Sequence, residues 1–119
     1  MDSKVGRAVN EVIDAMVERR SCRSFKAEMP SEEQLDAVVE AGLYAASGMG
    51  RQSAIILKVT DRTLRDRLSA LNAQVMGAPE GTDPFYGAPA VLVVLAARDV
   101  PTHVYDGSLA MGNMLLAAD

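Results

Sequence analysis

The stretch DPFYGAPAVLVVLAA, residues 83–97, decides the fold prediction because it joins a loop-forming segment to a continuous apolar run. The Gly- and Pro-rich part completes a loop expected over residues 77–89, and a loop of that length within a compact domain is often functional or mobile. The run over residues 90–97 contains only Ala, Val and Leu, which is typical of a central strand covered on both faces. Residues 83–97 therefore predict a sheet with other elements packed against it.

The segments upstream of this run predict helices and a second strand. Apolar residues at helical spacing indicate an amphipathic helix over residues 9–18. Ser31 and Gln34 form a capping box, which predicts a helix that runs to about Ala46. Residues 54–60 predict a mostly buried strand. A single domain over residues 1–119, built from helices around a sheet, follows from this order.

The remaining two helices are expected on either side of the 83–97 stretch. Residues 62–76 predict a helix with an apolar face made of Leu64, Leu68, Leu71 and Val75. The charged run over residues 61–67 is most simply a solvated face of the same helix. Residues 106–119 predict a last helix that is apolar almost all round, and such a helix must be buried. We therefore expect that the chain ends within a fold and that something else covers this helix.

Composition and charge exclude several functional classes. The chain has 119 residues, 49% of them hydrophobic, and a formal net charge of -4, which argues against a nucleic-acid backbone as the main partner. The absence of a signal-peptide pattern or a long apolar stretch, together with a single Cys22, predicts a soluble cytoplasmic protein. Seven Met and no Trp suit a dimer interface or a ring-shaped ligand.

A cluster of cationic side chains follows the first expected helix. Arg19, Arg20 and Arg23, with Ser21 between them, offer forked donors and a hydroxyl to phosphate oxygens. The alternative is that these arginines only cap the C-terminal end of the helix. Spacing alone favours the capping alternative, because charged clusters are usually solvated.

A second candidate is the loop SGMGRQ at residues 47–52. Its small residues let backbone N–H groups approach a ligand closely, while Arg51 and Gln52 add side-chain donors. The alternative is a plain helix stop followed by a loop. The segment lacks the Gly patterns of a dinucleotide fold or a P-loop.

Four motifs in this order, RRSCRSF, SGMGRQ, DPFYGAPAVLVVL and YDGSLAMGNMLLAAD, resemble the FMN-dependent nitroreductase family over residues 9–119. The resemblance implies an α+β fold with a mixed sheet flanked by helices, incomplete at its C-terminal end, and an obligate homodimer with FMN at the subunit interface. It implies that FMN is held by Arg19, Arg20, Ser21 and Arg23 of one subunit and by Ser47, Gly48, Gly50 and Gln52 of the other. Asn72 lies where similar enzymes often place a polar flavin contact.

The resemblance also implies a mechanism: NAD(P)H reduces the flavin, and a nitroaromatic, quinone or similar acceptor then takes its place, in a ping-pong cycle. The flavin carries the chemistry, so no side chain is nominated as catalytic, and no metal is expected. Ala46, Gly50 and Ser53 depart from the usual Pro, Asn and Pro, and we expect weaker FMN binding without the Asn amide. Two other hypotheses stay open: a non-catalytic flavin-binding or dimerisation module, and a domain that binds another phosphate ligand.

Overall fold

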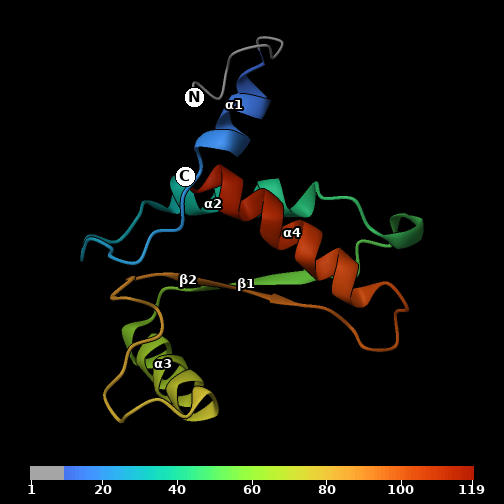
Figure 1. Ribbon diagram of the computed structural model, residues 1–119. Helices are drawn as coiled ribbons and strands as arrows, with labels where there is room; N and C mark the ends of the chain where they lie inside the picture. Colours follow the sequence, from blue (N-terminus) through green and yellow to red (C-terminus); the bar gives the residue numbers. More distant parts are fainter. Residues whose placement is uncertain (1–9) are drawn as a thin grey trace.

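Helices cover both sides of a small antiparallel sheet (Figure 1). The computed structural model describes residues 10–119. Within that range the sheet consists of β1 (Ile55–Val59) and β2 (Val91–Leu95), paired from Ile55 opposite Leu95 to Val59 opposite Val91. Helices α2 (Glu32–Leu43) and α4 (His103–Ala117) lie on one side of the sheet, and α3 (Arg62–Met76) lies on the other (Figure 1). The predicted α+β arrangement is confirmed, whereas the sheet predicted as mixed is an antiparallel pair in the described residues.

Helix α2 begins after the predicted cap Ser31, whereas α1 begins after Asn10, a cap that the sequence analysis did not predict. Asn10 accepts hydrogen bonds from the N–H groups of the first turn of α1 (Glu11–Glu18), and the predicted helical position Val9 lies outside the described residues. The capping box is confirmed, because the Gln34 N–H donates to Ser31 Oγ at 3.1 Å and the Ser31 N–H donates to Gln34 Oε1 at 3.0 Å. Helix α2 ends at Leu43, three residues earlier than predicted, and a turn at Tyr44 and a bend at Ala45 follow it.

The prediction of buried strands is wrong for this chain. Ile55 and Leu57 of β1 are exposed, and four residues of β2 are only half-buried. Within the described residues each strand pairs with the other along one edge only. The buried apolar residues are correspondingly few: Leu35, Val59, Ala73, Ala110 and Met114.

Helix α3 has the predicted bounds but buries a different face. Leu64, Leu71 and Val75 are exposed, whereas Arg65, Ser69 and Ala73 are buried. The expectation that residues 61–67 are fully solvated is therefore wrong at Arg65. The physical reason is the loop that follows α3: its Ala88 carbonyl and Asp83 carboxylate lie within hydrogen-bond distance of the Arg65 side chain.

Helix α4 begins at His103, three residues before the predicted start, and packs against α2. Gly42 of α2 permits the close approach, because a Cβ at that position would come within 2.8 Å of Met114. The single chain buries α4 on one face only: Asp106, Ala110 and Met114 are buried, whereas Tyr105, Leu109 and Leu115 are exposed, as expected of a helix that something else covers. No helix in the described range is long and apolar enough to cross a membrane.

Candidate functional site

The arginine cluster lies where the chain leaves α1. Arg20 caps that helix, since its Nη1 donates to the carbonyls of Val17 and Arg19, each at 2.8 Å. For Arg20, the structure thus agrees with the alternative that these arginines cap the C-terminal end of the first helix. Ser21 and Arg23 are exposed and Arg19 is half-buried. These three side chains border solvent, so their donors are open to an anion.

The loop over residues 47–52 is a closed turn with unusual backbone angles. It contains the 3₁₀ turn η1 (Gly48–Gly50), and φ is positive at Met49, Gly50 and Gln52. The Gln52 N–H donates to Ser47 Oγ at 3.0 Å, which closes the turn. No atom lies within 4 Å of the place where a Cβ of Gly50 would stand, so a ligand can approach the backbone there. Ser47 and Gln52 also line a hollow of about 230 Å³ that reaches Asp106.

Gly48 and Asp106 join this loop to the beginning of α4. The Gly48 N–H donates to Asp106 Oδ1 at 2.9 Å, and Thr102 Oγ1 donates to Asp106 Oδ2 at 2.9 Å. Asp106 is 3% exposed, and both oxygens of its carboxylate accept hydrogen bonds from groups of the protein. Sequence reasoning placed Asp106 in the last helix without assigning it a contact, because its partner is 58 residues away in the chain.

Substitution of Gly48 by alanine should lower the free energy of unfolding by about 1–3 kcal/mol, the usual cost of forcing an extra methyl group into a packed contact. The added Cβ would lie 2.2 Å from Thr102 Oγ1 and 2.8 Å from Thr102 Cβ. Urea denaturation measures the loss. Thr102→Gly removes those Thr102 atoms but also the bond to Asp106, so it is measured alone as well. Gly48→Ala should cost less in the Thr102→Gly background than in wild type, and an equal cost in both would show that the clash is not the cause.

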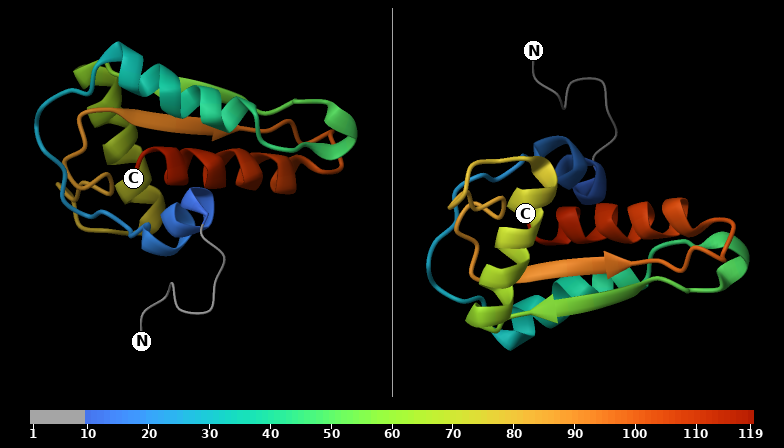
Figure 2. Two further views of the ribbon diagram at one scale, coloured as in Figure 1. Left: turned by 90° about the horizontal axis from the view of Figure 1, so that it is seen from above. Right: turned by 90° about the horizontal axis from the view of Figure 1, so that it is seen from below.

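The two predicted halves of the cofactor site lie at opposite ends of α4 in one chain. The Arg20 N–H donates to Asp119 Oδ1 at 3.4 Å, whereas Gly48 contacts Asp106. Asp119 is thirteen positions after Asp106, a separation of about 20 Å at the helical rise of 1.5 Å per residue. Figures 1 and 2 show the same separation, with α1 beside the C-terminal end of α4 and the 48–50 turn beside its beginning. One chain therefore does not bring the arginine cluster and the loop together.

Asn72, the remaining predicted contact, is exposed on α3. It borders a hollow of about 300 Å³ whose other lining includes Leu68, Phe85 and Met111. Met111 lies in the middle of α4, so Asn72 faces neither the arginine cluster nor the 47–52 loop at the ends of that helix. Its surroundings are apolar apart from its own amide.

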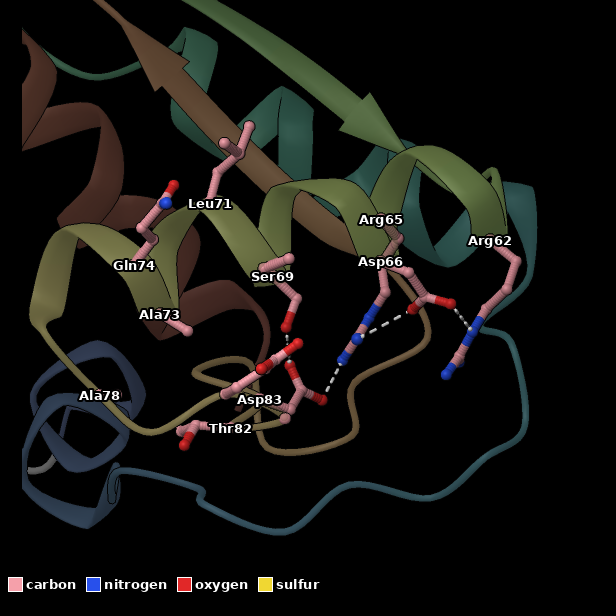
Figure 3. A pocket seen from close by; sticks show the side chains of 13 residues that line it. Arg62, Arg65, Asp66, Ser69, Leu71, Ala73, Gln74, Ala78, Thr82 and Asp83 are labelled. Atoms are coloured by element: carbon pink, nitrogen blue, oxygen red, sulfur yellow. Dashed lines mark hydrogen bonds and ion pairs between the residues drawn. The ribbon is translucent and has the colours of Figure 1, made fainter.

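A buried charge network between α3 and the 77–89 loop was not predicted from the sequence (Figure 3). Arg65 is 2% exposed and donates to Asp83 Oδ2 at 2.5 Å, to Ala88 O at 2.8 Å and to Asp66 Oδ1 at 3.2 Å. Its guanidinium also lies 5.4 Å from the centre of the Phe85 ring, a cation–π contact. Asp83 receives a further bond from Ser69 Oγ at 2.8 Å.

Burial raises the pKa of the Asp83 carboxyl, but the bonds from Arg65, Ser69 and two backbone N–H groups lower that pKa well below its ordinary value of 3.8. The backbone donors are Phe85 at 3.1 Å and Gly87 at 2.8 Å. Asp83 thus fastens the end of the loop to α3 and fixes how the chain enters β2. We assign this network a structural role, since its donors and acceptors satisfy one another.

The chain is similar to known proteins in both sequence and structure. The family model described as "Nitroreductase family" matches residues 16–119. Among curated proteins, the FMN reductase [NAD(P)H] of Bacillus subtilis is 35% identical over 63 residues, which cover 53% of this chain and 25% of that protein.

Solved structures show the same similarity. A nitroreductase with bound FMN from Bacteroides fragilis has a TM-score of 0.84 at 26% identity, over 92% of this chain and 65% of that one. A nitroreductase with bound FMN from Desulfitobacterium hafniense has a TM-score of 0.80 at 31% identity, over 93% of this chain and 65% of that one. The chain thus spans about 65% of the length of these structures and a quarter of the curated relative.

Proposed function

Because the chain belongs to the nitroreductase family, whose model matches residues 16–119, we propose that it is part of an FMN-dependent oxidoreductase. In this proposal NAD(P)H is the reductant, and nitroaromatics, quinones or similar electron-poor compounds are the acceptors. The predicted nitroreductase-like fold is confirmed by the TM-scores of 0.84 and 0.80 to the two nitroreductases. The observation that carries the cofactor proposal is the set of donors at half-buried Arg19 and at exposed Ser21 and Arg23, whose chemistry fits a phosphate.

The residues present suit the two ends of FMN. Guanidinium forks and a hydroxyl match the oxygens of a phosphate monoester. The 47–52 loop, with open space at Gly50 and the amide of Gln52, suits a flat ring that needs close backbone contact. When bound, FMN supplies the redox chemistry, by accepting a hydride from NAD(P)H and passing electrons to the acceptor. The protein binds and orients, and no side chain is assigned an acid, base or nucleophile role.

We propose a homodimer in which each cofactor lies between the arginine cluster of one chain and the 47–52 loop of its partner. The separation of about 20 Å along α4 supports this arrangement, since one chain presents the two halves at opposite ends of the helix. The exposed apolar side chains of α4, among them Tyr105, Leu109 and Leu115, supply a surface that suits burial against a second copy. Asn72 remains a proposed polar contact from α3.

A cytoplasmic location is part of the proposal. Cys22 is the only cysteine in the sequence, and NAD(P)H is an intracellular reductant. Both favour a reducing compartment over a disulfide-forming one.

Flavin binding and turnover test the proposal together. The protein should bind about one FMN per chain with a flavin absorption spectrum, and should oxidise NADH or NADPH when a nitroaromatic or a quinone is added. Double-reciprocal plots of rate against NAD(P)H concentration, at several fixed acceptor concentrations, should give parallel lines. That pattern is characteristic of a ping-pong cycle. Bound FMN without turnover would favour the non-catalytic module. A protein that binds no FMN would contradict the flavin proposal and favour another phosphate ligand.

A further inference from the structure

We propose that Asp106 is the positioning residue that holds the 47–52 loop in the shape needed for cofactor binding. The inference rests on the proposed function, since it concerns the loop assigned there to the flavin. It adds a residue that has no direct contact with the cofactor in that assignment. The first observation is that Asp106, at 3% exposure, is one of the most buried residues described in the chain.

Both oxygens of the Asp106 carboxylate accept hydrogen bonds, one from the 47–52 loop and one from the residue that precedes α4. Oδ1 accepts from the Gly48 N–H and Oδ2 accepts from Thr102 Oγ1, each at 2.9 Å. Bonds to a carboxylate are shorter and stronger than bonds between neutral groups. Burial makes the loss of either bond more destabilising, because a buried donor or acceptor without a partner is not compensated by water.

The loop needs such a tether because its own backbone is strained. Met49 and Gln52 have φ of 55° and 49°, angles that residues with side chains adopt reluctantly. Strained backbone of this kind persists only where its surroundings determine it. The bond from Gln52 N–H to Ser47 Oγ closes the turn locally, and the bond from Gly48 to Asp106 fixes that turn against α4.

The position of Asp106 in α4 has a competing explanation. An acidic side chain in the first turn of a helix is stabilised by the helix dipole, and that effect alone requires no contact with the loop. The explanations differ in what they predict for Gly48. If Asp106 acts only on the helix dipole, its substitution leaves hydrogen exchange at the Gly48 N–H and the affinity for FMN unchanged. If Asp106 positions the loop, its substitution changes both.

The test compares Asp106→Ala with Asp106→Asn. Asparagine keeps an acceptor oxygen for the Gly48 N–H, and its amide can donate to Thr102 Oγ1, so this variant should restore most of the function. In Asp106→Ala, hydrogen exchange at the Gly48 amide should be faster and the dissociation constant for FMN should rise about tenfold, as expected for a lost buried hydrogen bond. In Asp106→Asn, both should stay within about threefold of wild type.

Each FMN titration is made at a temperature well below the thermal unfolding midpoint of the variant. A loss of stability then does not imitate a loss of affinity. Ser53→Ala is the matched control in the same segment, because Ser53 Oγ is buried and has no hydrogen-bond partner among the described residues. It should leave the exchange at Gly48 and the affinity for FMN unchanged.

The outcomes separate this inference from the proposed function. If wild type binds FMN and Asp106→Ala binds it equally well, the positioning role is overturned whether or not exchange at Gly48 changes, and the proposed function stands. If wild type binds no FMN, the proposed function falls and takes the positioning role with it. Weaker FMN binding and faster Gly48 exchange in Asp106→Ala, with rescue in Asp106→Asn, would support both.

Discussion

Replacing Arg65 by alanine should lower the free energy of unfolding by about 3 kcal/mol, the low end of the loss for a buried ion pair, because the Asp83 side chain is 32% exposed. Arg65 is 2% exposed and bonds to Asp83, Asp66 and the Ala88 carbonyl. Its loss leaves the Asp83 carboxylate without its cation and leaves a cavity between α3 and the 77–89 loop. Urea denaturation followed by circular dichroism measures the change.

Arg62→Ala is the matched control on the same helix. Arg62 is exposed and pairs with Asp66 one turn away at 3.1 Å, and such surface pairs contribute only about 0.3–0.5 kcal/mol. Arg65→Lys is an intermediate variant for use if Arg65→Ala does not fold. It keeps the charge but loses the fork that reaches several acceptors at once. Equal effects of Arg62→Ala and Arg65→Ala would contradict the buried network.

The same network sets a pH dependence on the acid side. The pKa of Asp83 is lower in the folded protein than its ordinary value of 3.8, so its contribution to stability is fully present above that value. The contribution is lost as pH falls below 3.8 toward the folded-state pKa. Asp83→Asn should remove this component, and its unfolding free energy should fall less steeply than that of wild type between about pH 4 and pH 2.

Local signals in the sequence were sufficient to predict where α2 and α3 begin, whereas the predicted start of α4 at Asp106 is three residues too late. Ser31 and Gln34 satisfy each other's backbone within four residues, so the start of α2 follows from chemistry that needs no tertiary contact. The bounds of α3 likewise follow from Asp61, whose carboxylate accepts from the Leu64 N–H, and from Gly77, which adopts φ of 70° at the end of the helix.

Burial could not be predicted in the same way, because it depends on what packs against an element. The apolar spacing of Leu64, Leu71 and Val75 predicts a buried face of α3, yet the 77–89 loop folds over Arg65 and Ser69 instead. The strands have apolar residues on both faces, and the described chain covers only part of them. Periodicity identifies a face that is suited to burial, but it does not identify the neighbour.

The candidate site likewise has a part that residue types predict and a part that depends on tertiary contacts. The donor groups at residues 19–23 and 47–52 could be recognised from residue types alone, since Arg, Ser and Gly offer known chemistry. Asp106 could not, because its role depends on a hydrogen bond to Gly48 that only the fold creates. The assignment of Arg20 as a helix cap likewise required the positions of two carbonyls.

The second large effect is expected at the arginine cluster. Arg19→Ala and Arg23→Ala should each raise the dissociation constant for FMN by about 10- to 100-fold, the effect of losing a hydrogen bond to a charged group at about 1.5–3 kcal/mol. Arg20→Ala should have a smaller effect on affinity, because the Arg20 guanidinium is engaged with the carbonyls of Val17 and Arg19. Fluorescence titration of FMN measures all three variants.

Riboflavin, which has the same ring system but no phosphate, shows whether these arginines act on the phosphate. The Arg19 and Arg23 variants should bind riboflavin as wild type does, so that the preference for FMN over riboflavin shrinks by the same factor as the FMN affinity. An equal loss for both ligands would mean that the arginines support the fold or the ring pocket instead of the phosphate. Unchanged FMN binding in both variants would leave the cluster as a solvated helix end, since spacing alone favoured that alternative. The ratio of the two affinities decides between these cases because a change in protein stability cancels from it.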